Sequence, residues 1–432
     1  MFRKISKAHV IAVDMGYGHW RAALPFADLT GGEGILAADN YSGIPSYDKH
    51  LWEQSRVFYE FVSRFKKFPV LGNFVFALFD KFQSIEEFYP KTHHLEGPTF
   101  QLKQVYRLMR KKSWGEHFID QLNANPLPLI TTFFIPAFMA EYWGYAGPIY
   151  LVIPDTDVSR AWAPLHPSKS RITYLASTRQ VALRLARYGV RKEHIIYTGF
   201  PLPYELLGEK KKKAKTILRR RLAHLDPENV WRHKYALLVK QYLGVLPKER
   251  ARNAPTLMFA IGGAGAQEDL AVHVMRGLAP RIKKKSLKLI VVAGIHEKLA
   301  KFLEKLAKEL QIKTGENKAL HILSAKTKEE YFISFGKAIQ ETDILWTKPS
   351  ELCFYSALGL PIIIAPPIGS QEIFNREWLL DVGAGVDQKD PKYVDQWLPD
   401  MIQEGVLARA AMQGYVEVPK DGAENISRFV TG

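Results

Sequence analysis

The chain has 432 residues, more than one hydrophobic core usually supports, which indicates two domains. Hydrophobic residues make up 47% of the sequence, and this share excludes a mainly disordered protein. The formal net charge of +16 points to an anionic partner, such as a phosphorylated ligand, a membrane surface or a nucleic acid. Charge alone does not choose among these partners.

The single cysteine, Cys353, excludes an internal disulfide and agrees with a reducing compartment. The positively charged N-terminus is followed by an apolar run that ends at Asp14, which is too short for a signal peptide. No uncharged stretch reaches the roughly 20 residues that a membrane-spanning helix needs. We therefore expect a cytoplasmic protein.

The first half alternates strand-like and helix-like runs, which is typical of parallel β-α-β units. An apolar run at 8–14 predicts the first strand, and Pro25 leads us to expect regular helix only from Ala22 onward. Further strands are predicted at 126–134, 147–155 and 171–177, and a helix at 179–188 that ends before Gly189. A stretch rich in aromatic and basic residues, at about 45–120, interrupts the alternation.

The second half shows the alternation more clearly. A helix is predicted at 297–310, because Leu299, Phe302, Leu303, Leu306 and Leu310 recur at helical spacing. Other predicted helices lie at 268–282, 328–341, 350–358 and 371–383, and strands at 256–262, 287–294, 319–323, 343–346 and 360–367. Residues 208–254 carry lysine and arginine runs with little apolar periodicity. The predicted domains are therefore 1–207 and 255–432, joined by a basic linker or insertion at 208–254.

Each half has a glycine-rich turn directly after its first strand. Gly16 and Gly18 lie where a strand passes into a helix, and free backbone N–H groups at such a turn attract phosphate. A purely structural tight turn explains this pair equally well. Gly262, Gly263 and Gly265 form the second turn, for which we favour diphosphate binding because it follows a predicted parallel strand.

A third motif runs from Thr347 to Gly385 and contains two helix starts separated by a buried strand. Glu351 lies at the first start, and Gln371 and Glu372 lie at the second. Two such starts are able to face one nucleotide sugar. Acidic residues at helix N-termini are also ordinary caps, so Glu351 alone is more often a cap than a ligand.

Several segments occur in a characteristic order: GYGHWRAA, ASTRQVALRLARYGVRKEHIIYTGFPL, AIGGAGAQ, VVAGIHEKL and TKP…ALGLPIII…SQEIFN…GAG. In this order they resemble the monogalactosyldiacylglycerol synthase and processive diacylglycerol glucosyltransferase group, which is itself similar to the MurG-type transferases. The resemblance covers most of residues 8–390. It implies an α/β protein of the GT-B fold, with two Rossmann-like domains facing a central cleft. The N-terminal domain would bind the acceptor and the C-terminal domain the nucleotide sugar, usually UDP-linked.

The resemblance also implies roles for single residues. On the donor side, Gly262, Gly263 and Gly265 would flank the diphosphate, Gly294 would lie near the base, and Gln371, Glu372 and Asn375 would contact the sugar. On the acceptor side, Gly18 and His19 match a loop and Asp157 matches the acid of a Thr-Asp segment. The chain departs from the family at Phe354, which takes the place of a ribose-binding glutamate that Glu351 would replace. Its Thr-Asp segment also lacks the family's histidine.

We therefore predict an inverting glycosyltransferase that moves a sugar from a UDP-sugar to a membrane lipid. The nucleotide sugar is a substrate, so no cofactor is expected. We expect no metal, because Asp155-Thr156-Asp157 reads more simply as a strand end and the histidines lack ligand spacing. The candidate general bases are Asp157 and His19, with Asp157 slightly preferred. Aromatic residues interleaved with basic ones at 56–83 predict peripheral binding to an anionic membrane, unless they fill a domain core.

Other functions stay open. A nucleotide-sugar 2-epimerase has the same two-domain architecture. A non-catalytic binding protein of this fold would explain the departures from the family pattern. The net charge and the run KKKKAKTILRRR at 210–221 suggest a nucleic-acid binder, but no recognition module is visible, so we expect no specific nucleic-acid partner.

Overall fold

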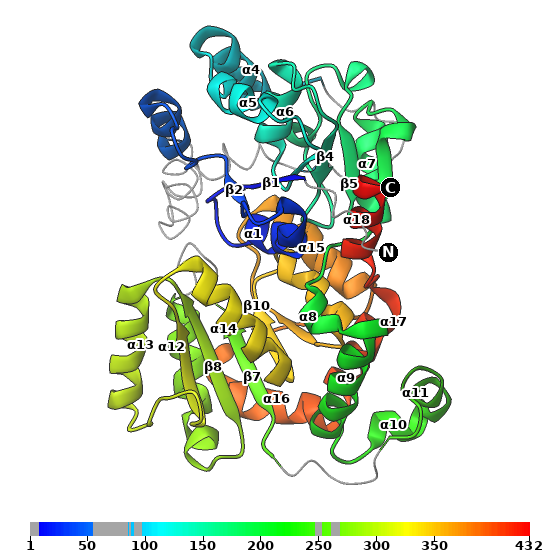
Figure 1. Cartoon of the computed structure of the whole chain (residues 1–432). Coiled ribbons are helices and arrows are strands. Elements are labelled where there is room, and N and C mark those ends of the chain that lie inside the picture. Colours follow the sequence, from blue (N-terminus) through cyan, green and yellow to red (C-terminus); the bar gives the residue numbers. More distant parts are fainter. Residues whose placement is uncertain (1–7, 55–84, 86–87, 90–96, 247–252, 261–267) are drawn as a thin grey trace. The chain divides into compact units, whose positions relative to one another are not determined.

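The computed structural model describes residues 8–54, 85, 88–89, 97–246, 253–260 and 268–432. The chain forms two compact units (Figure 1). Unit 1 consists of residues 1–203, 368–375 and 419–432, and unit 2 of residues 204–367 and 376–418. The last residues of the chain thus cluster with its N-terminal part, whereas the sequence grouped all of 255–432 in one domain.

Unit 1 is built on a six-stranded sheet of order β2-β1-β3-β4-β5-β6, in which every pair of neighbouring strands is parallel. The strands are β1 (His9–Ala12), β2 (Leu36–Ala37), β3 (Leu129–Thr131), β4 (Ile149–Val152), β5 (Thr173–Ala176) and β6 (Ile195–Tyr197). Its helices are α1 (Gly18–Ala23), η1 (Leu24–Thr30), α4 (Phe100–Lys112), α5 (Glu116–Asn123), α6 (Phe134–Tyr142), α7 (Arg179–Arg187) and α18 (Gly422–Thr431), with short turns η2 (Arg160–Trp162), η3 (Pro167–Lys169) and η4 (Lys192–His194).

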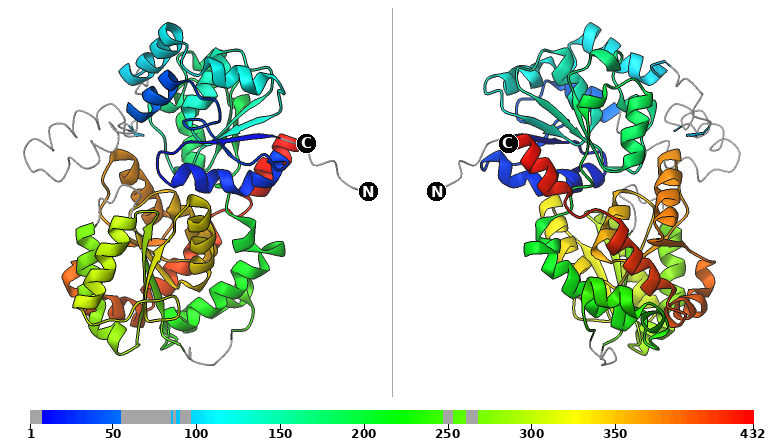
Figure 2. Two further views of the ribbon diagram at one scale, coloured as in Figure 1. Left: turned by 60° about the vertical axis from the view of Figure 1, so that its left-hand side comes forward. Right: turned by 90° about the vertical axis from the view of Figure 1, so that its right-hand side faces the viewer.

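Both faces of the unit 1 sheet are buried under helices (Figures 1 and 2). Successive side chains of β1 point to opposite faces, as in any strand. Ile11 packs in a core with residues of α5, α6 and α7, whereas Val10 packs in a second core with residues of α1 and α18. Burial on both faces explains why the strands are apolar throughout rather than alternating with polar residues.

Unit 2 contains a second six-stranded parallel sheet, of order β12-β11-β10-β7-β8-β9. The strands are β7 (Thr256–Ala260), β8 (Lys288–Gly294), β9 (Leu320–Ser324), β10 (Ile344–Thr347), β11 (Ile362–Ile364) and β12 (Gly385–Asp387). The helices are α8 (Tyr204–Leu207), η5 (Glu209–Lys211), α9 (Lys212–Leu225), α10 (Val230–Lys234), α11 (Ala236–Leu243), α12 (Glu268–Lys283), α13 (Glu297–Glu309), α14 (Lys328–Glu341), η6 (Glu351–Leu358), η7 (Pro391–Tyr393), α16 (Val394–Gln403) and α17 (Val406–Glu417). Helix α15 (Ser370–Asp381) has its first turns in unit 1 and continues in unit 2.

The basic stretch 208–254 is largely helical rather than a plain connection. Helix α9 buries Leu218, Leu222 and Leu225, which follow one another at helical spacing. Lysines and arginines between them hide this apolar stripe when the sequence is read by composition. The stretch therefore contributes to the packing of unit 2.

Some sequence expectations need correction in detail. Helix α1 begins at Gly18, not near Ala22, and Pro25 lies instead in the tighter helix η1 that follows it. The helix expected at 350–358 is the 3-10 helix η6. Phe302 is 45% exposed on α13, because the buried stripe of that helix passes through Ala300 and Ala307 instead. No helix among the described residues is long and apolar enough to cross a membrane.

Candidate functional site

The carboxyl ends of β1 and β3 lie side by side in unit 1, at the point where the sheet order reverses. β1 pairs with β2 on one side and with β3 on the other, so the chain leaves these two neighbouring strands in opposite directions. Open parallel sheets bind ligands at such switch points. The structure places Gly16, Gly18 and His19 directly after β1 at this position.

His19 is oriented by the loop after β3. Its Nδ1 lies 2.8 Å from the carbonyl oxygen of Thr132, and the Thr132 hydroxyl donates to the His19 carbonyl oxygen over 3.0 Å. The Phe133 ring meets the imidazole edge-on, with centroids 4.8 Å apart. A carbonyl oxygen only accepts, so Nδ1 carries the proton and Nε2 is the basic nitrogen of the neutral ring. This arrangement suits proton abstraction.

The turn before His19 is held by hydrogen bonds at both ends. The Asp14 carboxylate accepts from Trp20 Nε1 over 2.7 Å, and the Asp14 N–H donates to the Asp39 carboxylate over 2.9 Å. Gly16 has a φ of +97°, and nothing within 4 Å would obstruct a Cβ there. Backbone conformation, rather than lack of space, therefore requires glycine at this position.

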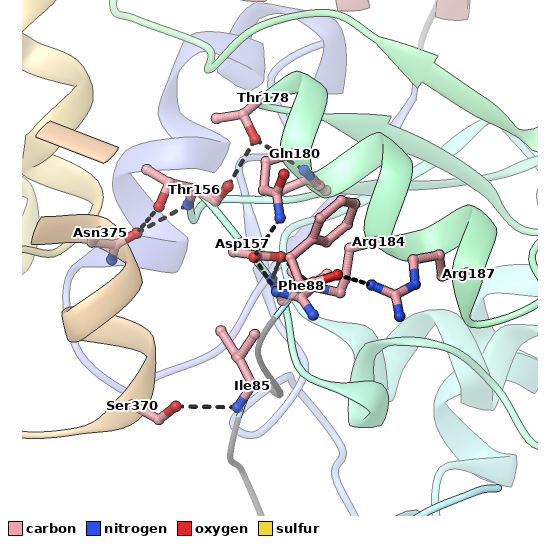
Figure 3. Close-up of polar contacts among 12 residues, drawn as sticks. Ile85, Phe88, Thr156, Asp157, Thr178, Gln180, Arg184, Arg187, Ser370 and Asn375 are labelled. Atoms are coloured by element: carbon pink, nitrogen blue, oxygen red, sulfur yellow. Dashed lines mark hydrogen bonds and ion pairs between the residues drawn. The ribbon is translucent and has the colours of Figure 1, made fainter. Parts of the chain in front are cut away.

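Asp157 follows β4 and is engaged on both oxygens. Its Oδ1 accepts from Arg184 Nε over 3.0 Å and from its neighbour's N–H, and its Oδ2 accepts from Arg184 Nη2 over 2.6 Å and from Gln180 Nε2 over 3.2 Å (Figure 3). The side chain is buried. A carboxylate whose lone pairs are used in this way is held for structure and is poorly placed to take up a proton.

Arg184 connects α7 to two other segments of unit 1. Its guanidinium lies over the Phe88 ring at 5.2 Å and over the Phe374 ring at 5.6 Å. Arg187, one turn further along α7, donates to the Phe88 carbonyl oxygen over 2.6 Å (Figure 3). A desolvated guanidinium between aromatic rings is stabilised by both its carboxylate and the ring faces. Arg184 thus joins the loop that contains Asp157, the ring of Phe88 and the first turns of α15.

Asn375 is buried in unit 1 and hydrogen-bonds to the loop after β4. Its Oδ1 accepts from the Thr156 N–H over 3.0 Å and from the Thr156 hydroxyl over 2.7 Å. Its Nδ2 donates to Asp155 over 3.3 Å, and the Thr156 carbonyl in turn accepts from Thr178 over 2.7 Å. The amide that the resemblance assigned to a sugar contact therefore anchors α15 to the strand edge.

The other residues at the start of α15 also make local bonds. Glu372 Oε2 accepts from the Ile368 N–H over 2.8 Å, which caps the helix. The Ser370 hydroxyl accepts from the Ile85 N–H over 3.1 Å (Figure 3). Gln371, between them, is half-buried. The family resemblance implies that this turn contacts the sugar, and that role stays a prediction.

Unit 2 has its own switch point between β7 and β10. β7 pairs with β8 on one side and β10 on the other, and Thr347 at the end of β10 donates to the Ala260 carbonyl oxygen over 3.2 Å. The predicted diphosphate loop with Gly262, Gly263 and Gly265 connects β7 to α12 at this edge, but it lies outside the described residues.

Two further donor-side predictions lie at the same edge of unit 2. Gly294 ends β8 with a φ of +66°, which favours glycine. Glu351 opens η6 and is buried, and Phe354 in the same helix packs on Trp378 with centroids 5.1 Å apart. Phe354 is therefore a core residue, and its side chain has no polar atom that could bind a ribose.

Three residues of the unit 1 edge are hard to find from the sequence. Arg184, Phe88 and Phe374 carry little signal, because their partners lie far away in the chain. The spacing of Arg184 and Arg187 on one helix face was the only hint. Among the described residues, no group of three or more histidines, cysteines or carboxylates is arranged to hold a metal ion.

Comparison with known proteins agrees with this architecture. A family model described as a domain of unknown function (DUF6938) matches residues 246–420, which include Gly294, Glu351 and α15. No curated protein matches the sequence. MurG of Acinetobacter baumannii is similar, with a TM-score of 0.49, 12% identity and coverage of 98% of this chain and 99% of that chain. A UDP-GlcNAc 2-epimerase from Neisseria meningitidis, bound to UDP-GlcNAc, has a TM-score of 0.50, 9% identity and coverage of 98% and 99%. With the two parallel sheets, this likeness shows a GT-B type fold of two Rossmann-like units, as expected from the sequence.

Proposed function

We propose that this chain transfers a sugar from a UDP-sugar to a hydroxyl group of a membrane lipid, with inversion at the anomeric carbon. The observation that carries the proposal is the glycine turn directly after β1, at the switch point of the unit 1 sheet. This turn leads into His19, whose Nδ1 is held by Thr132. In unit 2 the sequence places Gly262, Gly263 and Gly265 between β7 and α12.

The nucleotide sugar is assigned to unit 2. Backbone N–H groups of a glycine loop that leads into a helix are suited to a diphosphate, and Lys348 follows the adjacent strand β10 with a positive charge. The similar epimerase, whose structure contains UDP-GlcNAc, supports a UDP-sugar as the ligand class. The acceptor is assigned to unit 1, where His19 lies at the strand edge.

The proposed step is a single displacement. The acceptor hydroxyl oxygen attacks the anomeric carbon and forms the new C–O bond, while the bond from that carbon to the diphosphate oxygen breaks. The bonding pair leaves with UDP. His19 Nε2 takes the hydroxyl proton. Asp157 takes no proton but pairs with Arg184 and so holds the loop after β4 in place. This choice of base follows from the contact of His19 Nδ1 with Thr132, which makes Nε2 the basic nitrogen of the ring, and from the full engagement of the Asp157 oxygens.

A nucleotide-sugar 2-epimerase is the competing function, because it has the same fold. Such an enzyme would be expected to place several carboxylates and a histidine around the sugar. Two carboxylates at the strand edge near His19 already bind other side chains. Asp14 accepts a hydrogen bond from Trp20, and Asp157 pairs with Arg184. This arrangement favours the transferase.

The lipid nature of the acceptor is proposed from the sequence. The aromatic and basic residues at 56–83, on which it rests, lie outside the described residues. Their composition suits a lipid–water interface with anionic headgroups. Peripheral association of a cytoplasmic protein with such a membrane is part of the same proposal.

The full-length protein tests the proposal in a screen of UDP-sugars, each with and without vesicles that contain diacylglycerol. We expect UDP release only with acceptor, together with a new glycolipid. Conversion of UDP-GlcNAc to its 2-epimer without acceptor would establish the epimerase instead. Absence of both products, with no nucleotide binding by calorimetry, would identify a non-catalytic relative.

A further inference from the structure

An exposed apolar patch lies on the short helices α10 and α11 of unit 2, together with the turn that follows them. Leu237 is 85% exposed and Val245 is 79% exposed, the highest values among the large hydrophobic residues that the structure describes. Val230 and Tyr235 in the same stretch are exposed as well. Single exposed apolar residues are common on proteins, but several within 16 residues, 230–245, mark an interaction surface.

The patch belongs to a well-anchored part of unit 2. Val239 and Leu243, on the opposite face of α11, are buried. Trp231 stacks on Tyr235 with centroids 5.2 Å apart, and Asp226 accepts from the backbone N–H groups of Trp231 and Arg232 over 3.1 and 2.8 Å. The chain therefore keeps Leu237 in water while it buries Val239 and Leu243 on the opposite face of α11.

Basic residues surround the apolar ones. Lys234 and Lys240 are both exposed. Lys240 lies three residues after Leu237 on α11, near its side of that helix, whereas Lys234 ends α10 with its Nζ 5.5 Å from the centre of the Tyr235 ring. Residues 230–245 contain three lysines and arginines, which are Arg232, Lys234 and Lys240, and no acidic residue. The surface thus combines apolar side chains with positive charge.

We propose that the α10–α11 patch, residues 230–245, is a docking surface for an anionic lipid membrane. The aliphatic side chains would enter the acyl boundary, and the lysines would meet the headgroups. A nucleic acid would use the positive charge but would leave Leu237 and Val245 without a role. These residues lie apart in the sequence from those at 56–83, and the proposed docking does not depend on the proposed sugar transfer.

The first experiment reports directly on contact. Cys353 is the only cysteine and is fully buried, so a polarity-sensitive fluorophore attaches selectively to a Leu237→Cys variant. We expect a blue shift with vesicles that contain phosphatidylserine and none with pure phosphatidylcholine. A label at Ile333→Cys, an exposed apolar position of α14, is the matched control and should not shift. An unchanged emission at position 237 would overturn the proposal.

The second experiment measures binding of the full chain by vesicle flotation. Each basic residue near an anionic surface contributes on the order of 1 kcal/mol. We therefore expect Lys234→Glu with Lys240→Glu, or Leu237→Glu alone, to weaken binding at least about tenfold. Ile333→Glu and the pair Lys298→Glu with Lys305→Glu on α13 should bind as the unchanged protein does. Equal weakening of vesicle binding in all variants would refute the assignment. So would a parallel RNA-binding measurement in which the changes at 234, 237 and 240 weaken RNA binding but leave vesicle binding as before.

Discussion

Arg184 and Asp157 form a buried ion pair in which two guanidinium nitrogens meet two carboxylate oxygens, at 3.0 and 2.6 Å. The pair joins α7 to the loop after β4, at the edge where His19 also lies. Both side chains are withdrawn from water. Removing one partner therefore leaves an isolated buried charge, which is far more costly than losing a pair on the surface.

We expect Asp157→Asn to lower the free energy of unfolding of unit 1 by about 3–5 kcal/mol, measured by urea denaturation. The double variant Asp157→Leu with Arg184→Met should regain most of this loss, because no charge remains buried. Arg376→Ala breaks the half-exposed pair with Asp387 and should cost less than about 1 kcal/mol. Equal losses for Asp157→Asn and Arg376→Ala would show that the buried pair has no special weight.

His19→Ala should lower turnover at least about a hundredfold while leaving the dissociation constant of the UDP-sugar nearly unchanged. The reason is that His19 lies in unit 1, whereas the nucleotide is assigned to unit 2. His9→Gln is the matched control, since His9 also contacts a backbone carbonyl but lies at the start of β1. Normal turnover of His19→Ala would remove His19 from the mechanism.

Elements with a strong apolar period were predictable from the sequence. Helices α12, α13 and α14 lie within one residue of their expected bounds, because leucines and other apolar residues recur every three or four positions. Helix α9 was missed because its buried stripe is interrupted by basic residues and includes the buried Arg221. Composition conceals a stripe of this kind, and only the fold reveals it.

Those residues of the candidate site that lie close together in the sequence were predictable. Gly16, Gly18 and His19 lie together at one strand–helix junction, so a short motif was enough to find them. The contacts of Arg184 with Asp157 and of Asn375 with Thr156 join residues 27 and 219 positions apart. Such pairs depend on how the strand ends are brought together, which no single segment encodes.

Asn375→Ala should loosen the first turns of α15. The Thr156 N–H would remain buried without its acceptor, at a cost of about 1–3 kcal/mol, and local opening would increase roughly tenfold to a hundredfold. Hydrogen exchange of residues 156 and 370–375 measures this change. Gln371→Ala, on the same helix, should leave exchange at Thr156 unaltered. Unchanged exchange in Asn375→Ala would show that other contacts hold the helix.

Arg221→Met should destabilise unit 2 by about 3 kcal/mol, because three buried carbonyl oxygens lose their donor. Arg221 bonds to Thr342, Leu358 and Ile339, and burial lowers its pKa to about 9. Arg221→Lys should not restore stability, since one ammonium group does not reproduce the planar guanidinium fork. Arg220→Met removes an exposed bond from the next residue and serves as the control in thermal unfolding.

His321 on β9 should make unit 2 less stable in acid. Burial lowers the pKa of His321 below its usual value of 6.5, and the nearby Glu316 and Glu341 oppose this only in part. The unfolded chain therefore binds the proton more readily than the folded chain. The free energy of unfolding should fall as the pH drops from about 6.5 through the lowered pKa. Unfolding measured at pH 8 and pH 5 should show a smaller difference for His321→Gln than for the unchanged chain, whereas His273→Gln on the exposed side of α12 should keep it. If His321→Gln retained the whole acid sensitivity, other groups would have to bind the protons, because a glutamine at this position has nothing to titrate.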